Sequence, residues 1–141
     1  MPTRKAEAEW EGNLAEGSGR LKVGSGAFAG PYSFKSRFEE GEAATNPEEL
    51  LGAAHAGCFT MALSLTLEKA GFKADRMDTK AVVTLEQGGD GFSITAVALS
   101  LRAKIPNIDD ATFQSLAGQA KANCPVSKLF KAEITLDAAL V

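Results

Sequence analysis

Several residue types that particular chemistries depend on are scarce in this sequence. It holds one histidine, one tryptophan, one tyrosine and two cysteines in 141 residues. A structural zinc site uses closely spaced cysteine and histidine ligands, and the chain has neither a CxxC nor an HxxH pair. The formal net charge of -3 leaves no basic stripe to neutralise phosphates. We therefore expect neither a metal site of that kind nor a nucleic-acid partner.

A secretion signal is also lacking from the N-terminal segment MPTRKAEAEWEG, which has charges but neither an apolar core nor a small-residue cleavage pattern. We accordingly expect a cytoplasmic protein. In that reducing compartment, two cysteines are more often free, metal-bound or catalytic than joined in a permanent disulfide. Cys58 and Cys124 are the two candidates.

The composition is that of an ordinary soluble globular protein, with 45% hydrophobic and 23% charged residues. A chain of this length can bury one core but is too short for two ordinary domains, so a single domain over residues 1–141 is expected. The first third alternates like antiparallel strands at 5–10, 19–23 and 32–38. In the last of these strands, Arg37 would face away from the aromatic side.

A strong helix start follows in the segment TNPEEL. Asn46 can cap the helix, Pro47 suits the first helical position, and Glu49 can close a capping box. The helix should run to about residue 70 and end at Gly71. Residues 50–67 include no acid, lysine or arginine, which just reaches the ~18 residues of a membrane span. We reject that interpretation, because histidine, glycines and hydroxyl residues interrupt the segment and strand-like segments flank it.

A long, centrally buried helix explains this segment better, since apolar residues lie all round it. At about 1.5 Å per residue it would be ~36 Å long, close to the width of a domain of this size. One subunit can hardly cover such a helix, so we expect a homodimer.

The second half predicts strands at 79–86 and 92–104, a helix from Asp109 to about residue 123, a short helical turn after Pro125 and a final strand at 132–140. The expected order is β-β-β-α-β-β-α-β. Such an order indicates the α+β class, with antiparallel sheets around the long helix, and not a doubly wound parallel sheet.

Cys58 falls in the middle of the long helix. Taken alone, it is most simply an inert core cysteine, because burial raises the thiol pKa and suppresses the thiolate. A catalytic role would need a nearby positive charge. Cys124 precedes Pro125 and would stand at the start of a short helix, where partial positive charge favours a thiolate. A cysteine that merely fills a corner between helices is an equal alternative for this position.

The two cysteines are 66 positions apart, and the sequence alone does not show that they meet. If they do, they suit a two-step cycle in which Cys58 attacks a peroxide, becomes a sulfenic acid and condenses with Cys124 into a disulfide that an external dithiol reduces. Lowering the Cys58 pKa by about 2 units requires roughly 2.7 kcal/mol, which one close guanidinium can supply.

Arg37 stands out among the arginines because the start of the Cys58 helix follows within about ten residues of it. Of the two adjacent acids, Glu49 suits capping, while Glu48 could hold a guanidinium in a bidentate grip and aim it at a peroxide oxygen. Each residue has a simpler alternative. Arg37 could be a solvated strand residue, and the two acids could merely favour the first turn of the helix.

His55 lies three residues before Cys58 and so shares nearly the same helical face, which raises the possibility of a Cys-His hydrolase. The absence of an evident acid to orient the ring argues against it. A metal site built from His55, Cys58 and Cys124 is equally weakly supported by their spacing.

Four segments together resemble the OsmC/Ohr family of organic hydroperoxide reductases. They are AEAEWEGNL, YSFKSRFEEG, TNPEELLGAAHAGCFTMALSL and KANCPVSKLFKAEITL, in the order and spacing of that family and over nearly the whole chain. The resemblance is to the OsmC branch more than to the Ohr branch, because of the acid-rich loop at 39–44.

The resemblance implies that Cys58 is the peroxidatic cysteine, Cys124 the resolving one, and Arg37 with Glu48 the activating pair. It further implies an OsmC-like fold in an intertwined homodimer with active sites at the interface. Organic hydroperoxides are the implied substrates, with no metal, haem or flavin, and dithiols of the lipoyl type are suggested as reductants by the Ohr branch. His55 receives no catalytic part.

Two rival functions remain open at this point. One is a noncatalytic binder of an apolar small molecule between the long helices. The other is a redox sensor that uses the same disulfide to change shape. A binder would tolerate the loss of Arg37, and a sensor would form the disulfide yet turn over peroxide poorly.

Overall fold

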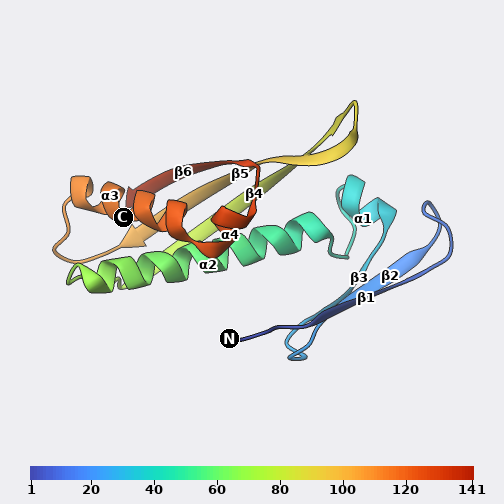
Figure 1. The fold of residues 1–141 in the computed structure, drawn as a ribbon, viewed down its shortest axis with the longest axis horizontal. Helices are drawn as coiled ribbons and strands as arrows, with labels where there is room; N and C mark the ends of the chain where they lie inside the picture. Colours follow the sequence, from blue (N-terminus) through green and yellow to red (C-terminus); the bar gives the residue numbers. More distant parts are fainter. The chain divides into compact units, whose positions relative to one another are not determined.

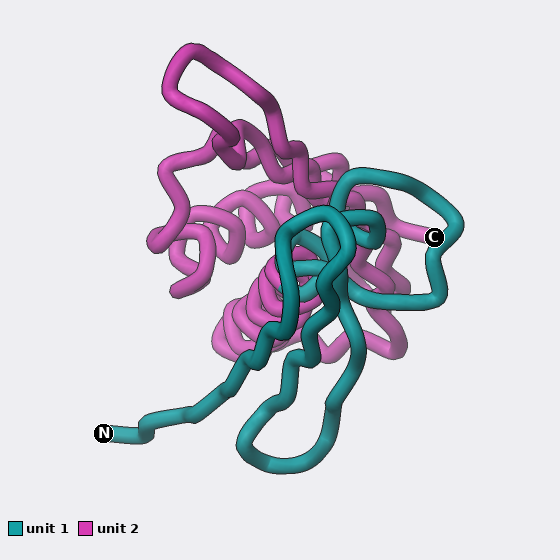
Figure 2. The backbone as a smooth tube through the Cα atoms, turned by 90° about the vertical axis from the view of Figure 1, so that its right-hand side faces the viewer, with its two compact units in different colours: residues 1–50 teal, residues 51–141 magenta.

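The computed structural model describes residues 1–141 and has the mixed α+β architecture expected from the sequence (Figure 1). Two compact units make up the chain, residues 1–50 and residues 51–141 (Figure 2). Their boundary falls inside the long helix. That the chain behaves as one domain stays a prediction. The elements, in order, are β1 (Ala6–Glu11), β2 (Ser18–Val23), β3 (Ala29–Tyr32), α1 (Phe34–Phe38), α2 (Pro47–Lys69), β4 (Arg76–Gly88), β5 (Gly91–Lys104), α3 (Asp110–Asn123), α4 (Pro125–Leu129) and β6 (Glu133–Leu140).

Unit 1 is built on a three-stranded antiparallel sheet in the order β1-β2-β3. Gly19 on the middle strand pairs with Trp10 on one side and with Tyr32 on the other. A Cβ atom on Gly19 would lie 2.5 Å from the Tyr32 ring and 2.8 Å from the Trp10 ring. Because glycine has no side chain, the two rings meet edge to face with their centroids 5.4 Å apart.

The prediction of a strand at 32–38 is wrong. β3 ends at Tyr32, and residues 34–38 form the short helix α1 instead. The cause is a capping box that alternation alone does not reveal: Ser33 Oγ accepts from the backbone N–H of Ser36 at 3.1 Å, and Ser36 Oγ accepts from that of Ser33 at 2.9 Å. Arg37 therefore lies on a helix, and the strand face that we assigned to it does not exist.

The long helix α2 begins and ends close to where the sequence predicts. Asn46 Oδ1 accepts the backbone N–H of Glu49 at 2.7 Å and so caps the first turn. The Glu49 carboxylate accepts the Thr45 hydroxyl at 3.1 Å, in place of the capping-box bond expected from the sequence. At the other end, Gly71 adopts a φ of 88°, a left-handed conformation that glycine takes without strain.

Unit 2 contains the second sheet, in the order β4-β5-β6. The β4–β5 hairpin is antiparallel as expected, but β6 runs parallel to β5, so this sheet is mixed. The reason is the connection between β5 and β6: α3 and α4 return the chain to the same end of the sheet, as a parallel pairing requires. Asp109 caps α3 as expected, accepting the backbone N–H of Thr112 at 2.6 Å.

The core of unit 2 lies between α2, β5 and α3. It consists of Phe59, Leu63, Leu67, Val97, Leu99, Leu101, Ala103, Ile105, Phe113, Ala117, Ala120 and Cys124. On another side of α2, Met61 is 77% exposed and Leu65 is 53% exposed. The chain thus covers only part of this apolar helix, and the homodimer expected to cover the rest stays a prediction.

By length and composition α2 would also qualify as a membrane-crossing helix, a criterion that core helices of soluble proteins meet as well.

Candidate active site

The two cysteines meet in unit 2. Cys58 lies midway along α2, and Cys124 stands at the junction where α3 ends and α4 begins, with Pro125 at the start of α4. Cys124 Sγ and Cys58 Sγ lie within hydrogen-bond distance of each other, 3.0 Å apart. Both are free thiols, Cys124 fully buried and Cys58 partly so. Two residues that are 66 positions apart are thus brought into direct contact.

The surroundings of the two sulfurs favour different protonation states. Burial raises the pKa of Cys58, and the Cys124 thiol raises it further, against a smaller opposing effect of the Val126 backbone N–H. Burial also disfavours a thiolate at Cys124, but there the Cys58 side chain and the N–H and hydroxyl of Ser127 together outweigh it and lower the pKa. Among these groups none carries a positive charge. Cys58 therefore needs a cation from outside this set to become a nucleophile.

His55 is fully buried near the thiols and is not arranged for the Cys-His hydrolase considered above. Its Nε2 atom lies 2.7 Å from Ser127 Oγ, and its Nδ1 atom has no hydrogen-bond partner. The ring packs edge-on against Phe130 with centroids 5.3 Å apart. Burial lowers the pKa of His55, which keeps the ring neutral. No three side chains of the His, Cys, Asp and Glu types are grouped as a metal site would need.

Ser127 is a residue that the sequence interpretation missed. It lies three positions after Cys124, at the N3 position of α4, where a side chain can turn back towards the residue that precedes the helix. The short helix was predicted, so the serine at this position was the available signal. Its hydroxyl lies 2.7 Å from His55 Nε2, and its N–H and hydroxyl lower the pKa of Cys124.

Arg37 and Glu48 form the second close pair, in unit 1. The guanidinium donates through Nη2 to Glu48 Oε1 at 2.6 Å, and through Nε to Oε1 at 3.1 Å and to Oε2 at 3.2 Å. The Glu48 carboxylate is largely buried, whereas the Arg37 side chain is 39% exposed. This is the bidentate grip expected from the sequence. It fixes the direction of a guanidinium that still reaches solvent.

The position of Arg37 depends on how α1 is held against the start of α2. Ser36 is buried and donates its hydroxyl to the carbonyl of Thr45 at 2.7 Å. Asn46, which caps α2, donates its side-chain amide to the carbonyl of Ser36 at 3.1 Å. These bonds join the turn before α2 to α1, so that Arg37 and Glu48 meet although 11 positions separate them.

An apolar pocket opens beside Arg37. It has a volume of about 300 Å³ and is lined mainly by aromatic rings, namely those of Trp10, Tyr32, Phe34 and Phe38, together with Leu14, Ser33 and Arg37 itself. The Arg37 guanidinium lies 5.7 Å from the centre of the Phe38 ring, within the range of a cation–π contact. A cation is thus placed at the edge of a space suited to an apolar group.

In unit 2 a groove of about 800 Å³ reaches Cys58 between α2 and α3. It is lined by Cys58, Met61, Ala62, Leu65, Thr66, Lys69, Ala70, Leu116, Gln119, Ala120, Asn123 and Pro125. Most of these side chains are apolar or small, which gives Cys58 access to a non-polar ligand from one side.

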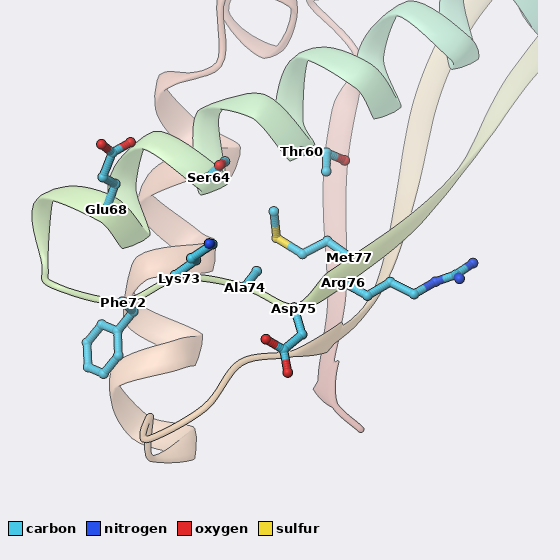
Figure 3. A pocket seen from close by; sticks show the side chains of 9 residues that line it. All are labelled: Thr60, Ser64, Glu68, Phe72, Lys73, Ala74, Asp75, Arg76 and Met77. Atoms are coloured by element: carbon cyan, nitrogen blue, oxygen red, sulfur yellow. The ribbon is translucent and has the colours of Figure 1, made fainter.

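A third cavity, of about 550 Å³, lies between α2 and the segment leading into β4 (Figure 3). Its lining is mixed and contains no cysteine. The Met77 side chain extends towards α2, while that of Arg76 points away from the helix (Figure 3). On the surface, Arg76 forms a salt bridge with Asp78, with Nε 2.7 Å from Oδ2. We assign no chemistry to this cavity.

The family described as OsmC-like protein matches residues 39–139. This chain belongs to the OsmC family. The match begins after Arg37 but includes Glu48, Cys58 and Cys124.

The chain is similar to a protein named for OsmC and to organic hydroperoxide resistance proteins. The OsmC family member named Peroxiredoxin OsmC from Escherichia coli is 51% identical over 95% of this chain and 94% of its own length. Organic hydroperoxide resistance protein OhrA from Bacillus subtilis is 31% identical over 70% of each chain. An OsmC-like protein of unknown function from Vibrio cholerae shares the fold, with a TM-score of 0.80 at 17% identity over 99% of this chain and all of the other.

Proposed function

We propose that this chain is a thiol peroxidase that reduces organic hydroperoxides to alcohols, with Cys58 as the peroxidatic cysteine and Cys124 as the resolving cysteine. The observation that carries the proposal is the direct contact of the two free sulfurs at 3.0 Å. The names of the relatives, peroxiredoxin and organic hydroperoxide resistance protein, point to the same chemistry.

The proposed reaction has three steps: oxidation of Cys58, formation of the disulfide, and reduction of the disulfide. The Cys58 thiolate attacks the outer peroxide oxygen, the O–O bond breaks, and the leaving alkoxide takes a proton and departs as the alcohol. Cys58 is left as a sulfenic acid. Cys124 attacks that sulfur, the disulfide forms, and its thiol proton leaves with the hydroxyl group as water. An external dithiol then donates two electrons and two protons, and both thiols are restored.

Arg37 is the cation that this mechanism assigns to the activation of Cys58. A guanidinium stabilises the thiolate and the negative charge that develops on the peroxide oxygens. The Glu48 carboxylate fixes the orientation of the Arg37 guanidinium by accepting three hydrogen bonds from it. The Arg37 side chain nevertheless stays 39% exposed, so the guanidinium remains accessible.

The preference for organic peroxides over hydrogen peroxide rests on the apolar spaces beside the proposed reactive groups. The aromatic pocket of about 300 Å³ adjoins Arg37, and the groove of about 800 Å³ adjoins Cys58. Burying an apolar group contributes roughly 25 cal/mol per Å², which hydrogen peroxide cannot gain. The proposal also includes a homodimer, a cytoplasmic location and a dithiol reductant of the lipoyl type.

The deciding experiment measures peroxide loss in the presence of excess dithiol, with cumene hydroperoxide compared against hydrogen peroxide. We expect rapid turnover that favours the organic peroxide and disappears in Cys58→Ser. Ser64→Ala, a change on α2 at an exposed position, is the matched control and should retain full turnover. Turnover that persists in Cys58→Ser would refute the proposal. A disulfide that forms without turnover would favour a redox sensor instead.

A further inference from the structure

A buried histidine that the proposed peroxidase cycle does not use lies at the end of a chain of polar groups leading to Cys124. His55 is fully buried, and its Nε2 atom is 2.7 Å from Ser127 Oγ. Ser127 is itself buried and lies three residues after Cys124, in the first turn of α4, and its N–H and hydroxyl lower the pKa of Cys124. Cys124 in turn contacts Cys58 at 3.0 Å. Two close contacts, His55 with Ser127 and Cys124 with Cys58, are thus separated only by the first turn of α4.

The direction of the hydrogen bonds in this chain follows from the unpartnered atom of His55. Nδ1 is buried and has no partner. If Nδ1 carried the proton of the neutral ring, a buried N–H donor would be left unsatisfied, whereas a bare lone pair there is less costly. The unpartnered Nδ1 therefore favours the neutral ring with its proton on Nε2. In that tautomer the N–H donates to Ser127 Oγ, which leaves the Ser127 hydroxyl hydrogen free to donate onward.

We propose that His55 and Ser127 are positioning residues for the resolving step, with Ser127 donating its hydroxyl hydrogen to Cys124 Sγ and His55 fixing the hydroxyl in that direction. This inference rests on the proposed function, since a resolving step exists only in that cycle. It assigns a role to two buried residues that the thiol chemistry itself leaves unexplained.

The proposed series of donors from His55 through Ser127 to Cys124, called the donor chain below, acts in the step in which Cys124 becomes the nucleophile. The Cys124 sulfur forms a bond to the Cys58 sulfenic sulfur, the S–O bond breaks, and the proton given up by the Cys124 thiol leaves in the water. Ser127 and His55 keep their own protons throughout. A hydroxyl that points at the sulfur stabilises its anionic form and lowers the pKa of Cys124, in the direction found for this residue.

The titratable groups that face Cys124 are Cys58 on α2 and, through Ser127, His55 on the same helix. Burial lowers the pKa of His55, so its ring stays neutral while the thiol titrates. The pH profile of Cys124 therefore reports on the donor chain without interference from a second charge change at His55.

The test uses full-length protein carrying Cys58→Ser, in which Cys124 is the one remaining thiol. Its rate of alkylation by iodoacetamide is measured against pH. Adding Ser127→Ala should raise the apparent pKa of Cys124 by about one unit, a tenfold loss of thiolate at a fixed pH below that pKa. Ser127→Thr, which keeps the hydroxyl, should restore the profile. Ser115→Ala on the exposed face of α3 is the control. Equal profiles for the Ser127→Ala and parent proteins would overturn the proposal.

A second measurement needs no substitution. The chain has a single histidine, so nitrogen-15 NMR of its imidazole reads His55 directly in the native protein. The proposal requires the neutral tautomer with the proton on Nε2. A proton on Nδ1 would make Ser127 the donor to His55, remove the donor to Cys124 and refute the arrangement.

A third measurement separates this inference from the proposed function. In stopped-flow mixing with one equivalent of cumene hydroperoxide, Ser127→Ala in the otherwise native protein should oxidise Cys58 at an unchanged rate and form the disulfide about tenfold more slowly. If disulfide formation keeps its native rate, the inference fails while the peroxidase stands. If no peroxide is reduced by the native protein, the proposed function fails, and the alkylation and NMR results still decide whether the donor chain exists.

Discussion

Each unit of the chain contains one close pair of reactive side chains, and the two pairs differ in kind. Unit 1 pairs a cation with an anion, Arg37 with Glu48 at 2.6 Å. Unit 2 pairs two free cysteines, Cys58 with Cys124 at 3.0 Å. The charge pair has no nucleophile of its own. The thiol pair has nucleophiles, but burial raises the pKa of Cys58 and no cation stands among the groups that shift it.

The contrast indicates that the two pairs would serve different steps of the proposed cycle. A buried thiol pair can exchange electrons and form a disulfide, but it is slow to start because little thiolate is present at Cys58. A guanidinium held by a carboxylate can stabilise a thiolate, but it has no sulfur on which a sulfenic acid or a disulfide could form. Substitutions that remove one pair while leaving the other intact should therefore produce different failures.

Among substitutions that keep Cys58, the largest effect is expected from Cys124→Ser, which also keeps both charged residues. The protein should consume about one equivalent of cumene hydroperoxide and then stop, because the Cys58 sulfenic acid has no thiol partner. Multiple turnover should fall by more than about a thousandfold. Mass spectrometry should detect the sulfenic acid after trapping with dimedone, and steady turnover without it would contradict the assignment of Cys124.

Arg37→Ala should leave the thiol pair intact and slow the attack on peroxide by about a hundredfold, which corresponds to a Cys58 pKa about 2 units higher. Because a larger share of Cys58 would be protonated at neutral pH, the rate should keep rising to higher pH than in the native protein. Arg37→Lys keeps the charge but loses the planar guanidinium, so its rate of attack on peroxide should lie between those of the native protein and Arg37→Ala. A pH profile unchanged by Arg37→Ala would show that Cys58 draws its activation from elsewhere.

Glu48→Gln should have a smaller effect, about tenfold on the same rate, because the cation remains and only its orientation is loosened. Glu49→Gln, one position further along the helix, is the matched control, since that carboxylate binds Thr45 and not Arg37. Stopped-flow measurement of the first oxidation step compares the two. Equal rates for both variants would remove Glu48 from the mechanism.

The smallest effect is expected from Asn46→Ala, which tests the joint between α1 and α2. Asn46 caps α2 through Glu49 and also donates to the carbonyl of Ser36. Its loss should lower the free energy of unfolding by about 1 kcal/mol, with the rate of thiol oxidation reduced only slightly. Urea unfolding measures the first quantity. A stability loss several times larger would mean that the α1 segment depends on this one residue.

Much of this fold was predictable because its signals are local. The caps at Asn46 and Asp109 and the break at Gly71 each act within one turn of chain, and the structure has all three. The strand predicted over α1 failed for a related reason. Ser33 and Ser36 form a capping box within a segment that also alternates in polarity, and the hydrogen bonds of the box decided the outcome.

The candidate site was predictable only in part. The resemblance to a family named Cys58, Cys124, Arg37 and Glu48, and the structure brings them together as two pairs. Spacing alone did not show that residues 66 positions apart would meet, because that contact depends on the packing of α2 against the α3–α4 corner. Ser127 was missed because a serine in a short helix is uninformative until the buried ring that it contacts is known.

The parallel pairing of β6 with β5 has a consequence for the newly made protein. Cys124 lies on the connection between these strands, so it reaches its place only as that late pairing forms. Synthesis proceeds at about 5–20 residues per second, so Cys58 precedes its partner by roughly 3 to 13 s, given the 66 positions between them. During that interval an oxidised Cys58 would have no thiol to resolve it, and further oxidation to the sulfinic acid would be irreversible. In the proposed cycle, a nascent chain whose Cys58 is oxidised during this interval is therefore open to permanent damage that the complete protein avoids by forming the disulfide.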